Sequence, residues 1–311
     1  MEIVGLRERN DILNLVDSGG PDMVFAEVAE IAHSMDPDFP VESFRAVFND
    51  VKRLYEGSYP GYRAGDTPYH DFNHTLQTVL ALSRLMHGCY LDHDCVYSRG
   101  LFLGLVSALM HDTGYIPEDG ETEGTGARFT LVHISRGIAF MQHYCERHGF
   151  SKEDISFIRH CIQCTEIRTD IDSIGFSSTE EKTIGKMLGM SDLLGQMADR
   201  CYPEKLLLLY GEFVEGKIDV FTSERDLLAK TVHFFDQVKE RFDTAFDGMH
   251  QYLAAHFRLR WGIDSELYIE AIGRNIAYID IILQSDGDDY RDLLKRNDIV
   301  DRLRQDVDGM T

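Results

Sequence analysis

The chain has 311 residues, of which 43% are hydrophobic, and its 53 acidic against 31 basic residues give a formal charge of −22. This composition excludes wholesale disorder, and the length suffices for one large domain or two small ones. A surface this acidic repels nucleic-acid backbones and anionic membranes, so we expect neither polymeric nucleic acid nor a membrane as a partner. A small phosphorylated substrate is compatible with it, because a bound divalent metal reverses the local field.

Targeting and redox signals favour a cytoplasmic protein. Residues 1–17 lack the basic start and apolar core of a signal peptide, and the longest apolar stretch, Leu101–Met110, is too short to span a bilayer. The six scattered cysteines do not form a disulfide framework, so we expect thiols in a reducing compartment.

Apolar residues recur with helical spacing along almost the whole chain, and convincing period-two alternation is absent. The expected helices are, in chain order, 44–54 before Gly57, a helix from the capping pair Ser178 and Glu181, Lys205–Phe213 after Pro203, 232–246 after Ser223, and 272–283. The expected irregular segments are loops at Gly57–Thr67, Pro117–Arg128 and Thr169–Thr179, and a hinge at Ser285–Asp289 before a last short helix. The sequence therefore predicts an all-α fold in one helical domain with terminal extensions.

Two histidines form the first candidate motif, Tyr69-His70-Asp71-Phe72-Asn73-His74. Pro68 can begin a helix, which would place His70 and His74 at positions i and i+4 on one face. Asp71 and Asn73 lie on other faces of the same turn, where capping or hydrogen bonding to the ligands is the expected role.

A second motif, His111-Asp112, ends the apolar stretch that begins at Gly100. A helix that is apolar nearly all round is buried, and two ionisable residues at its end are costly unless something pairs with them. A metal ion is the natural partner, because imidazole and carboxylate are common metal ligands and an aspartate can bridge two ions. Asp192 places another lone acid inside a later apolar run.

A histidine, an adjacent His-Asp pair and a distant aspartate, all on helices, resemble the pattern of the HD superfamily of metal-dependent phosphohydrolases. Tyr-His-x-x-x-His at 69–74 is similar to the motif of the cyclic-nucleotide phosphodiesterases in that superfamily. The resemblance covers about 65–200 and implies an HD-like helical bundle. It implies that His70 protonates the leaving oxygen and that His74, His111, Asp112 and Asp192 bind metal, with His70 and Asp112 as the catalytic residues.

Two further histidines bear on the number of metal ions. Cyclic-nucleotide enzymes carry a third His four residues after the His-Asp histidine, where this chain has Tyr115. Dinuclear HD enzymes instead use two histidines before the last aspartate, and His133 and His160 are similarly placed here. The resemblance thus implies one or two divalent ions (Mg, Mn, Fe or Zn). The alternative role for each histidine is a core side chain bonded to a backbone carbonyl.

We therefore expect a phosphohydrolase, an enzyme of the class that cleaves ester bonds. Its expected substrate is a small phosphoester such as a nucleotide or cyclic nucleotide. In this enzyme, metal-activated water attacks, and Arg63, Arg128 or Arg136 is available to hold the phosphate. Two alternatives are a di-iron oxygenase, as in myo-inositol oxygenase, and a regulatory HD module without turnover.

The predicted organisation has a helical extension at 1–60, a metal-binding catalytic core at 61–215 and packed C-terminal helices at 216–311. The Cys161-x-x-Cys164 pair has no second pair at zinc-site spacing, so buried thiols are expected there.

Overall fold

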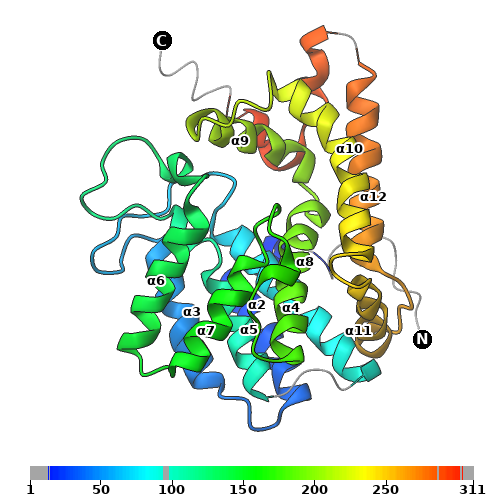
Figure 1. Ribbon diagram of the computed structural model, residues 1–311. Coiled ribbons are helices and arrows are strands. Elements are labelled where there is room, and N and C mark those ends of the chain that lie inside the picture. The colour runs from blue at the N-terminus through cyan, green and yellow to red at the C-terminus, as the bar shows by residue number, and fades with distance from the viewer. Residues whose placement is uncertain (1–12, 14, 94–97, 286, 302, 304–311) are drawn as a thin grey trace.

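The computed structural model describes residues 13, 15–93, 98–285, 287–301 and 303 (Figure 1). These residues form α-helices and short 3₁₀-helices, and the β-structure among them is limited to an isolated bridge between Tyr62 and Glu118. The predicted all-α fold is confirmed. No helix in the described ranges is both long and apolar enough to cross a bilayer.

The helices follow one another in chain order, with the longest connections between α3 and α4, α5 and α6, and α7 and α8. The α-helices are α2 (Leu15–Met35), α3 (Val41–Tyr55), α4 (Phe72–His93), α5 (Ser98–Met110), α6 (His133–Arg147), α7 (Lys152–Gln163), α8 (Thr179–Ala198), α9 (Tyr202–Glu215), α10 (Glu224–Asp243), α11 (Tyr252–Trp261) and α12 (Leu267–Leu283). The 3₁₀-helices are η1 (Thr113–Tyr115), η2 (Gly126–Phe129), η3 (Ile171–Ser173), η4 (Met249–Gln251), η5 (Gly287–Asp292) and η6 (Arg296–Asp298).

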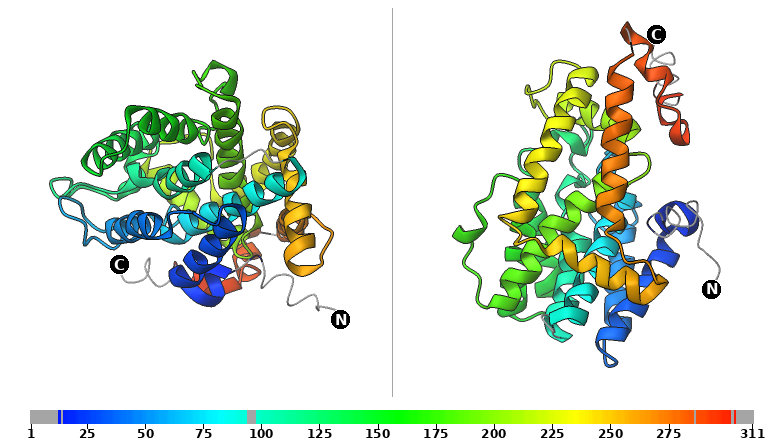
Figure 2. Two further views of the ribbon diagram at one scale, coloured as in Figure 1. Left: turned by 90° about the horizontal axis from the view of Figure 1, so that it is seen from below. Right: turned by 90° about the vertical axis from the view of Figure 1, so that its right-hand side faces the viewer.

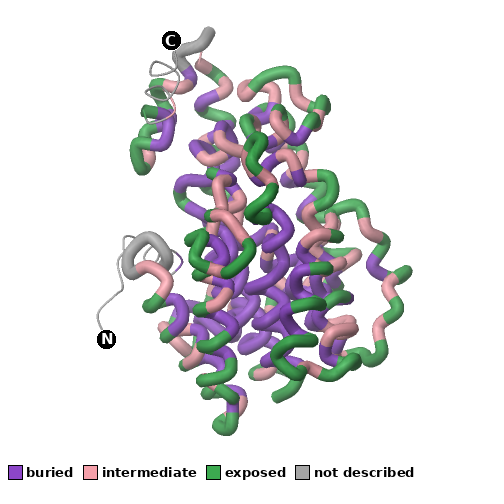
Figure 3. Tube along the Cα trace, turned by 90° about the vertical axis from the view of Figure 1, so that its left-hand side faces the viewer, coloured by how far each residue is buried: buried purple, intermediate pink, exposed green. Residues whose placement is uncertain are grey.

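Two neighbouring helices, α4 and α5, form the centre of the molecule. Every residue of α4 from His74 to Cys89 is buried, as is every residue of α5 from Gly100 to Met110. A helix without a polar face has to be covered on all sides, and α2, α3, α7, α8 and α11 pack around this pair. Figure 3 shows the buried segments gathered in the middle of the trace.

Glycine permits the closest of these helix contacts. A Cβ atom on Gly88 of α4 would lie 1.9 Å from the carbonyl oxygen of Tyr252, at the start of α11. One on Gly189 of α8 would lie 2.3 Å from the carbonyl oxygen of Cys164. These contacts are shorter than any side chain tolerates, so glycine sets how closely the elements approach α4 and α8.

The C-terminal helices pack on the same bundle. Figures 1 and 2 show α10 and α12 side by side, with α8 extending from the lower helices toward them. α12 packs against α8 and α9, and α11 packs against α4. The C-terminal part of the chain is therefore continuous with the helices that carry the candidate ligands.

Most predicted helix ends agree with the structure. Ser178 and Ser223 are N-caps, each accepting a hydrogen bond from the backbone three residues on, and Pro203 lies in the first turn of α9. The helix predicted over 232–246 ends earlier, at Asp243, because Thr244 leaves the helix and Phe246 packs into the core from the following turn.

The end of the chain and the cysteines differ in part from the prediction. The 3₁₀-helix η5 begins inside the predicted hinge, of which residue 286 lies outside the described residues. The predicted last short helix corresponds to the helical residues 299–301 and 303, which follow η6. Cys161 and Cys164 are buried free thiols, as predicted, and burial raises the pKa of Cys164 to about 12. The expectation that all cysteines are thiols is wrong for Cys89, which is disulfide-bonded.

Candidate metal centre

Four side chains from distant parts of the chain meet at one buried point. The Nε2 atoms of His74 and His111 lie 3.2 Å apart. His74 Nε2 lies 3.0 Å from Asp112 Oδ2 and 3.1 Å from Asp192 Oδ1. His111 Nε2 lies 3.2 and 3.6 Å from the same two oxygens. His74, His111 and Asp112 thus form a buried group whose ligand atoms could hold one ion, and Asp192 Oδ1 lies beside both of its nitrogens.

Three elements supply these ligands. His74 lies in the first turn of α4, where Asp71 accepts a hydrogen bond from its backbone N–H at 2.9 Å, which bears out the capping role expected for that residue. His111 and Asp112 follow the last residue of α5 and are 0% and 4% exposed, so the expected pair at the end of a buried helix is present. Asp192 lies within α8.

The tautomer of His111 suits a metal ligand. Its Nδ1 lies 2.8 Å from the carbonyl oxygen of Ala108, which can only accept a hydrogen bond. Nδ1 therefore carries the proton, and in the neutral ring the lone pair of Nε2 points toward the other three ligands. A backbone carbonyl behind a ligating histidine is the common way to fix this orientation.

The electrostatics of the cluster favour a cation. Burial lowers the pKa of His74, but hydrogen bonds and charge from Asp112 and Asp192 outweigh it and raise that pKa to about 9. Burial likewise opposes ionisation of Asp112, yet the two imidazoles hold its pKa well below the usual range. Although Asp112 Oδ2 is close to both imidazoles, it is buried without a hydrogen bond of good geometry. A divalent ion would satisfy that oxygen and replace the imidazole protons.

His70 lies beside this cluster but outside the helix predicted for it. α4 begins at Phe72, so His70 belongs to the preceding turn and not to an i, i+4 pair with His74. Pro68 does not begin the helix because Asp71 provides the cap three residues later. The two imidazole centroids are 5.8 Å apart with their planes at 86°.

A buried glutamate of α9 orients His70, and the sequence alone did not reveal it. Glu212 Oε2 lies 2.5 Å from His70 Nδ1, and Oε1 accepts a hydrogen bond from the backbone N–H of Tyr69 at 2.6 Å. The carboxylate therefore holds a proton on Nδ1 of His70, and Nε2 is the ring nitrogen that is left for proton transfer. A separation of 142 residues gives no local signal for this pair.

Asp192 also has a partner that the sequence reading missed. The Gln196 amide donates to Asp192 Oδ1 at 2.7 Å, and the Tyr69 hydroxyl donates to Gln196 Oε1 at 3.0 Å. Because Gln196 lies four residues after Asp192 on α8, the i, i+4 spacing could have identified it. The chain of bonds ties the α8 ligand to the turn that carries His70.

His133 approaches the cluster from the far side of Asp112. It is the first residue of α6, its Nδ1 lies 2.6 Å from the carbonyl oxygen of Thr130, and its Nε2 lies 3.9 Å from Asp112 Oδ1. Burial lowers the pKa of His133, which keeps the ring neutral near pH 7. The two oxygens of Asp112 therefore face different histidines, as a bridging carboxylate does.

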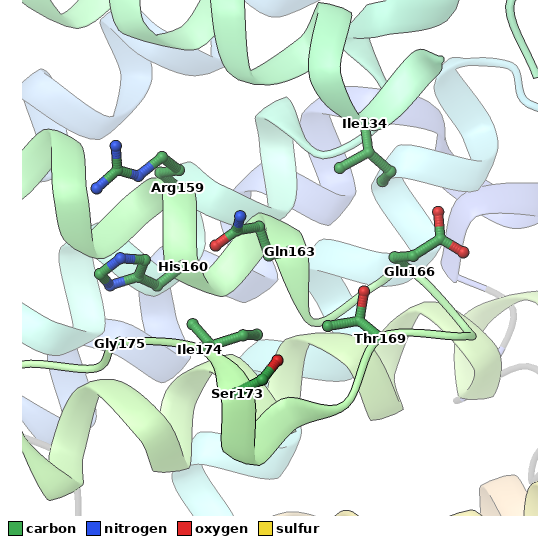
Figure 4. A pocket seen from close by; sticks show the side chains of 9 residues that line it. All are labelled: Ile134, Arg159, His160, Gln163, Glu166, Thr169, Ser173, Ile174 and Gly175. Carbon is green, nitrogen blue, oxygen red and sulfur yellow. The ribbon is translucent and has the colours of Figure 1, made fainter. Parts of the chain in front are cut away.

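His160 lies elsewhere. Its Nδ1 is 2.7 Å from Glu181 Oε1, and its side chain lines a cavity of about 460 Å³ between α6, α7 and the η3 segment (Figure 4). Gln163 and Thr169 line the same cavity. His160 is thus oriented by a carboxylate of α8 and not by a backbone carbonyl, and among the described residues no contact joins it to the converging ligands.

The three arginines that were candidates for phosphate binding form hydrogen bonds to loop 117–128. Arg136 forms a double hydrogen bond with the Glu121 carboxylate at 3.0 and 2.8 Å, and Arg63 donates to the Glu121 carbonyl oxygen at 2.6 Å. Arg128 bonds the carbonyl oxygen of Glu123. These contacts hold the loops 57–67 and 117–128 together.

A family model that matches residues 61–253 covers more than half of the chain. The chain belongs to the Npun_R2479-like family. The matched range contains the four converging ligands as well as His70, His133 and Glu212. No curated protein and no solved structure matches the sequence. Membership of the Npun_R2479-like family therefore names the group without assigning it an activity.

Proposed function

We propose that this protein is a metal-dependent phosphohydrolase with an HD-type site, acting on a small phosphoester, with nucleotides and cyclic nucleotides as the first candidates. The observation that carries the proposal is the convergence of His74, His111, Asp112 and Asp192 at one buried point. The second support is a histidine held by a buried carboxylate next to that point, because a proton donor beside a metal cluster is what phosphoester hydrolysis requires.

The ligand residues would hold the ion through His74 Nε2, His111 Nε2, Asp112 Oδ2 and Asp192 Oδ1. Once bound, such an ion supplies a water of lowered pKa and neutralises charge on the phosphate. Gln196 keeps Asp192 oriented, and the Ala108 carbonyl keeps His111 in the ligating tautomer. The sequence resemblance to HD phosphohydrolases rests on these same residues.

His70 is the proposed general acid. Hydrolysis forms a bond from the water oxygen to phosphorus and breaks the bond to the leaving oxygen, which takes up a proton from His70 Nε2. Glu212 stabilises the imidazolium before this transfer, and the proton released by the water restores it. Histidine suits the role, because its second ring nitrogen can carry the transferred proton while the first stays bonded to the carboxylate.

The geometry supports a first ion more fully than a second. A second ion would have Asp112 Oδ1 and His133 Nε2 on one side, and no contact among the described residues joins His160 to that pair. We therefore propose one tightly held ion, and His133 as the protein histidine available to a second, more weakly bound one.

Metal analysis combined with a phosphoester panel tests the proposal. The purified protein is stripped with a chelator, reloaded separately with Mg²⁺, Mn²⁺, Fe²⁺ or Zn²⁺, and assayed for bound metal and for release of phosphate or alcohol. We expect Asp112→Ala to lose both metal and activity, and His70→Ala to keep the metal and lose about 10²-fold or more in kcat. His148→Ala is the matched control, because this histidine is stacked on Tyr144 at the surface.

Two results would contradict the proposal. One is a wild-type protein that binds none of the four ions, or an Asp112→Ala variant that binds as much metal as wild type. The other is a metal-loaded protein that cleaves no phosphoester and, with iron, gives an oxygen-dependent product, which would indicate the oxygenase chemistry.

A further inference from the structure

The ring of Tyr115 lies between the rings of His70, the proposed proton donor, and His133. Its ring centroid lies 4.4 Å from that of His70 with the planes at 12°, and 4.5 Å from that of His133 with the planes at 19°. The three rings form one stack, with the tyrosine in the middle. Each separation lies at the short end of the range for stacked aromatic pairs.

The backbone holds the ring of Tyr115 in place. Tyr115 ends the 3₁₀-turn that follows the ligand pair, and its N–H donates to the carbonyl oxygen of Asp112 at 3.1 Å. A Cβ on the neighbouring Gly114 would lie 1.9 Å from the His133 carbonyl oxygen, and one on Gly126 would lie 2.1 Å from the Tyr115 carbonyl oxygen. The turn is therefore wedged between η2 and α6, and the ring is only 2% exposed.

His70 needs a second restraint besides Glu212. The Glu212 carboxylate fixes one ring atom, Nδ1, but a ring held at one atom can still turn about that contact. A parallel aromatic face removes this freedom, because turning the imidazole would separate the stacked surfaces. Together with the edge contact of Tyr69, whose ring centroid lies 4.9 Å away, these two contacts hold the plane of the imidazole and hence the direction in which Nε2 points.

We propose that Tyr115 is a positioning residue that holds the His70 imidazole in the plane from which it donates its proton, and that the same ring sets the place of His133 relative to Asp112. This inference rests on the proposed function, and it assigns a role to the position where the phosphodiesterase motif has a histidine. The proposed role is geometric and belongs to the aromatic face, and not to the hydroxyl group, which is hydrogen-bonded to Thr130.

The chemistry of the leaving group provides the test. The methyl ester of thymidine 5′-phosphate expels an alkoxide that needs a proton, whereas its p-nitrophenyl ester expels a phenolate that leaves without one. We expect Tyr115→Leu to lower kcat for the methyl ester by about tenfold or more relative to the p-nitrophenyl ester, with the tightly held ion still bound. Tyr115→Phe keeps the stack and should retain the wild-type ratio.

Tyr144→Leu is the matched control, because Tyr144 is a buried tyrosine of α6 stacked on His148 at 4.0 Å and away from the ligands. It should destabilise the fold without changing the ratio of the two esters. An NMR measurement of the His70 ring protons adds a readout independent of turnover, since they should lose the upfield shift of the tyrosine face in Tyr115→Leu and keep it in Tyr115→Phe.

The outcomes separate the two proposals. A Tyr115→Leu protein that keeps its metal and the wild-type ratio, or loses both esters equally, overturns the positioning role and leaves the phosphohydrolase intact. A wild-type protein that cleaves neither ester nor any other phosphoester with metal bound overturns the phosphohydrolase, and the positioning role with it.

Discussion

At the scale of single residues, the proposed proton donor depends on a carboxylate far away in the chain. Replacing Glu212 by Gln keeps an acceptor for the Tyr69 N–H but removes the negative charge from His70 Nδ1. We expect kcat to fall by about ten- to a hundredfold with metal content unchanged, because the site loses the group that orients and stabilises the imidazolium. Steady-state kinetics and metal analysis measure both quantities.

Glu215→Gln, one turn later on the same helix, is the control for this variant. That carboxylate accepts from the Thr125 hydroxyl at 2.7 Å and does not contact His70. Equal losses in both variants, or loss of metal in Glu212→Gln, would contradict the assignment.

A second residue-scale effect concerns two buried histidines far from the ligands. The Nδ1 atoms of His87 and His256 lie 2.8 Å apart, and burial together with the charge of Arg260 lowers the pKa of His87 to about 4. His87 in the folded protein therefore stays neutral at pH values below about 6.5, where the same side chain in the unfolded chain binds a proton. Stability from this group is complete above that pH and is lost as the pH falls toward 4.

The expected size is about 2 kcal/mol between pH 7 and pH 5 for His87 alone. Urea unfolding of wild type and His87→Gln at both pH values measures it, and the variant should lose less stability on acidification. The His250→Gln substitution should have the opposite effect on the pH dependence. His250 donates a hydrogen bond to Glu266, which raises the pKa of His250, so the stabilisation from this group is lost as the pH rises. A wild-type protein with equal stability at the two pH values, after correction for other groups, would refute the prediction.

At the scale of elements, Gly114 controls how α6 meets the metal centre. A methyl group there would collide with the His133 carbonyl oxygen, so Gly114→Ala must push the first turn of α6 away. We expect a loss of about 1–3 kcal/mol in the free energy of unfolding, together with weaker binding of any second ion. Gly120, which has open space around it, is the control, and Gly120→Ala should be close to neutral. Equal stability of the two variants in urea would show that α6 is free to shift.

At the scale of the whole molecule, the four ligands join α4, the end of α5 and α8, which together organise the core. The proposed metal ion would therefore link elements separated by up to 118 positions, counted from His74 to Asp192, and would bind the folded state alone. At a free concentration of one hundred times Kd, binding adds about 2.7 kcal/mol to stability. We expect a clearly higher Tm for metal-loaded than for chelator-treated protein, and no such increase in Asp192→Asn. A metal effect that persists in this variant would place the ion elsewhere.

The same scales separate what could be predicted from what could not. Helical periodicity, capping serines and an entirely apolar segment ending in His111-Asp112 are local properties, and each predicted its element correctly. The start of α4 was misplaced by four residues, because Pro68 and Asp71 both signal a helix start and only the hydrogen bond from Asp71 decides between them. The end of α10 was misplaced because Phe246 is buried from a turn and not from a helix.

By itself, the sequence determined the all-α fold, since helical periodicity is a local property. Its resemblance to HD phosphohydrolases named the four residues that converge, together with His160, which pairs with Glu181. Only the tertiary structure decided that Glu212 holds His70, that Tyr115 lies between two imidazoles, and that His160 pairs with Glu181. The separation in sequence is 142 positions for Glu212 and His70, 45 for Tyr115 and His70, and 21 for His160 and Glu181. These contacts depend on how the helices approach one another at glycines such as Gly114. Contacts between residues so far apart in the sequence leave no periodic pattern in a single sequence. Any side chain of the right shape and charge on another helix could have made the same contact.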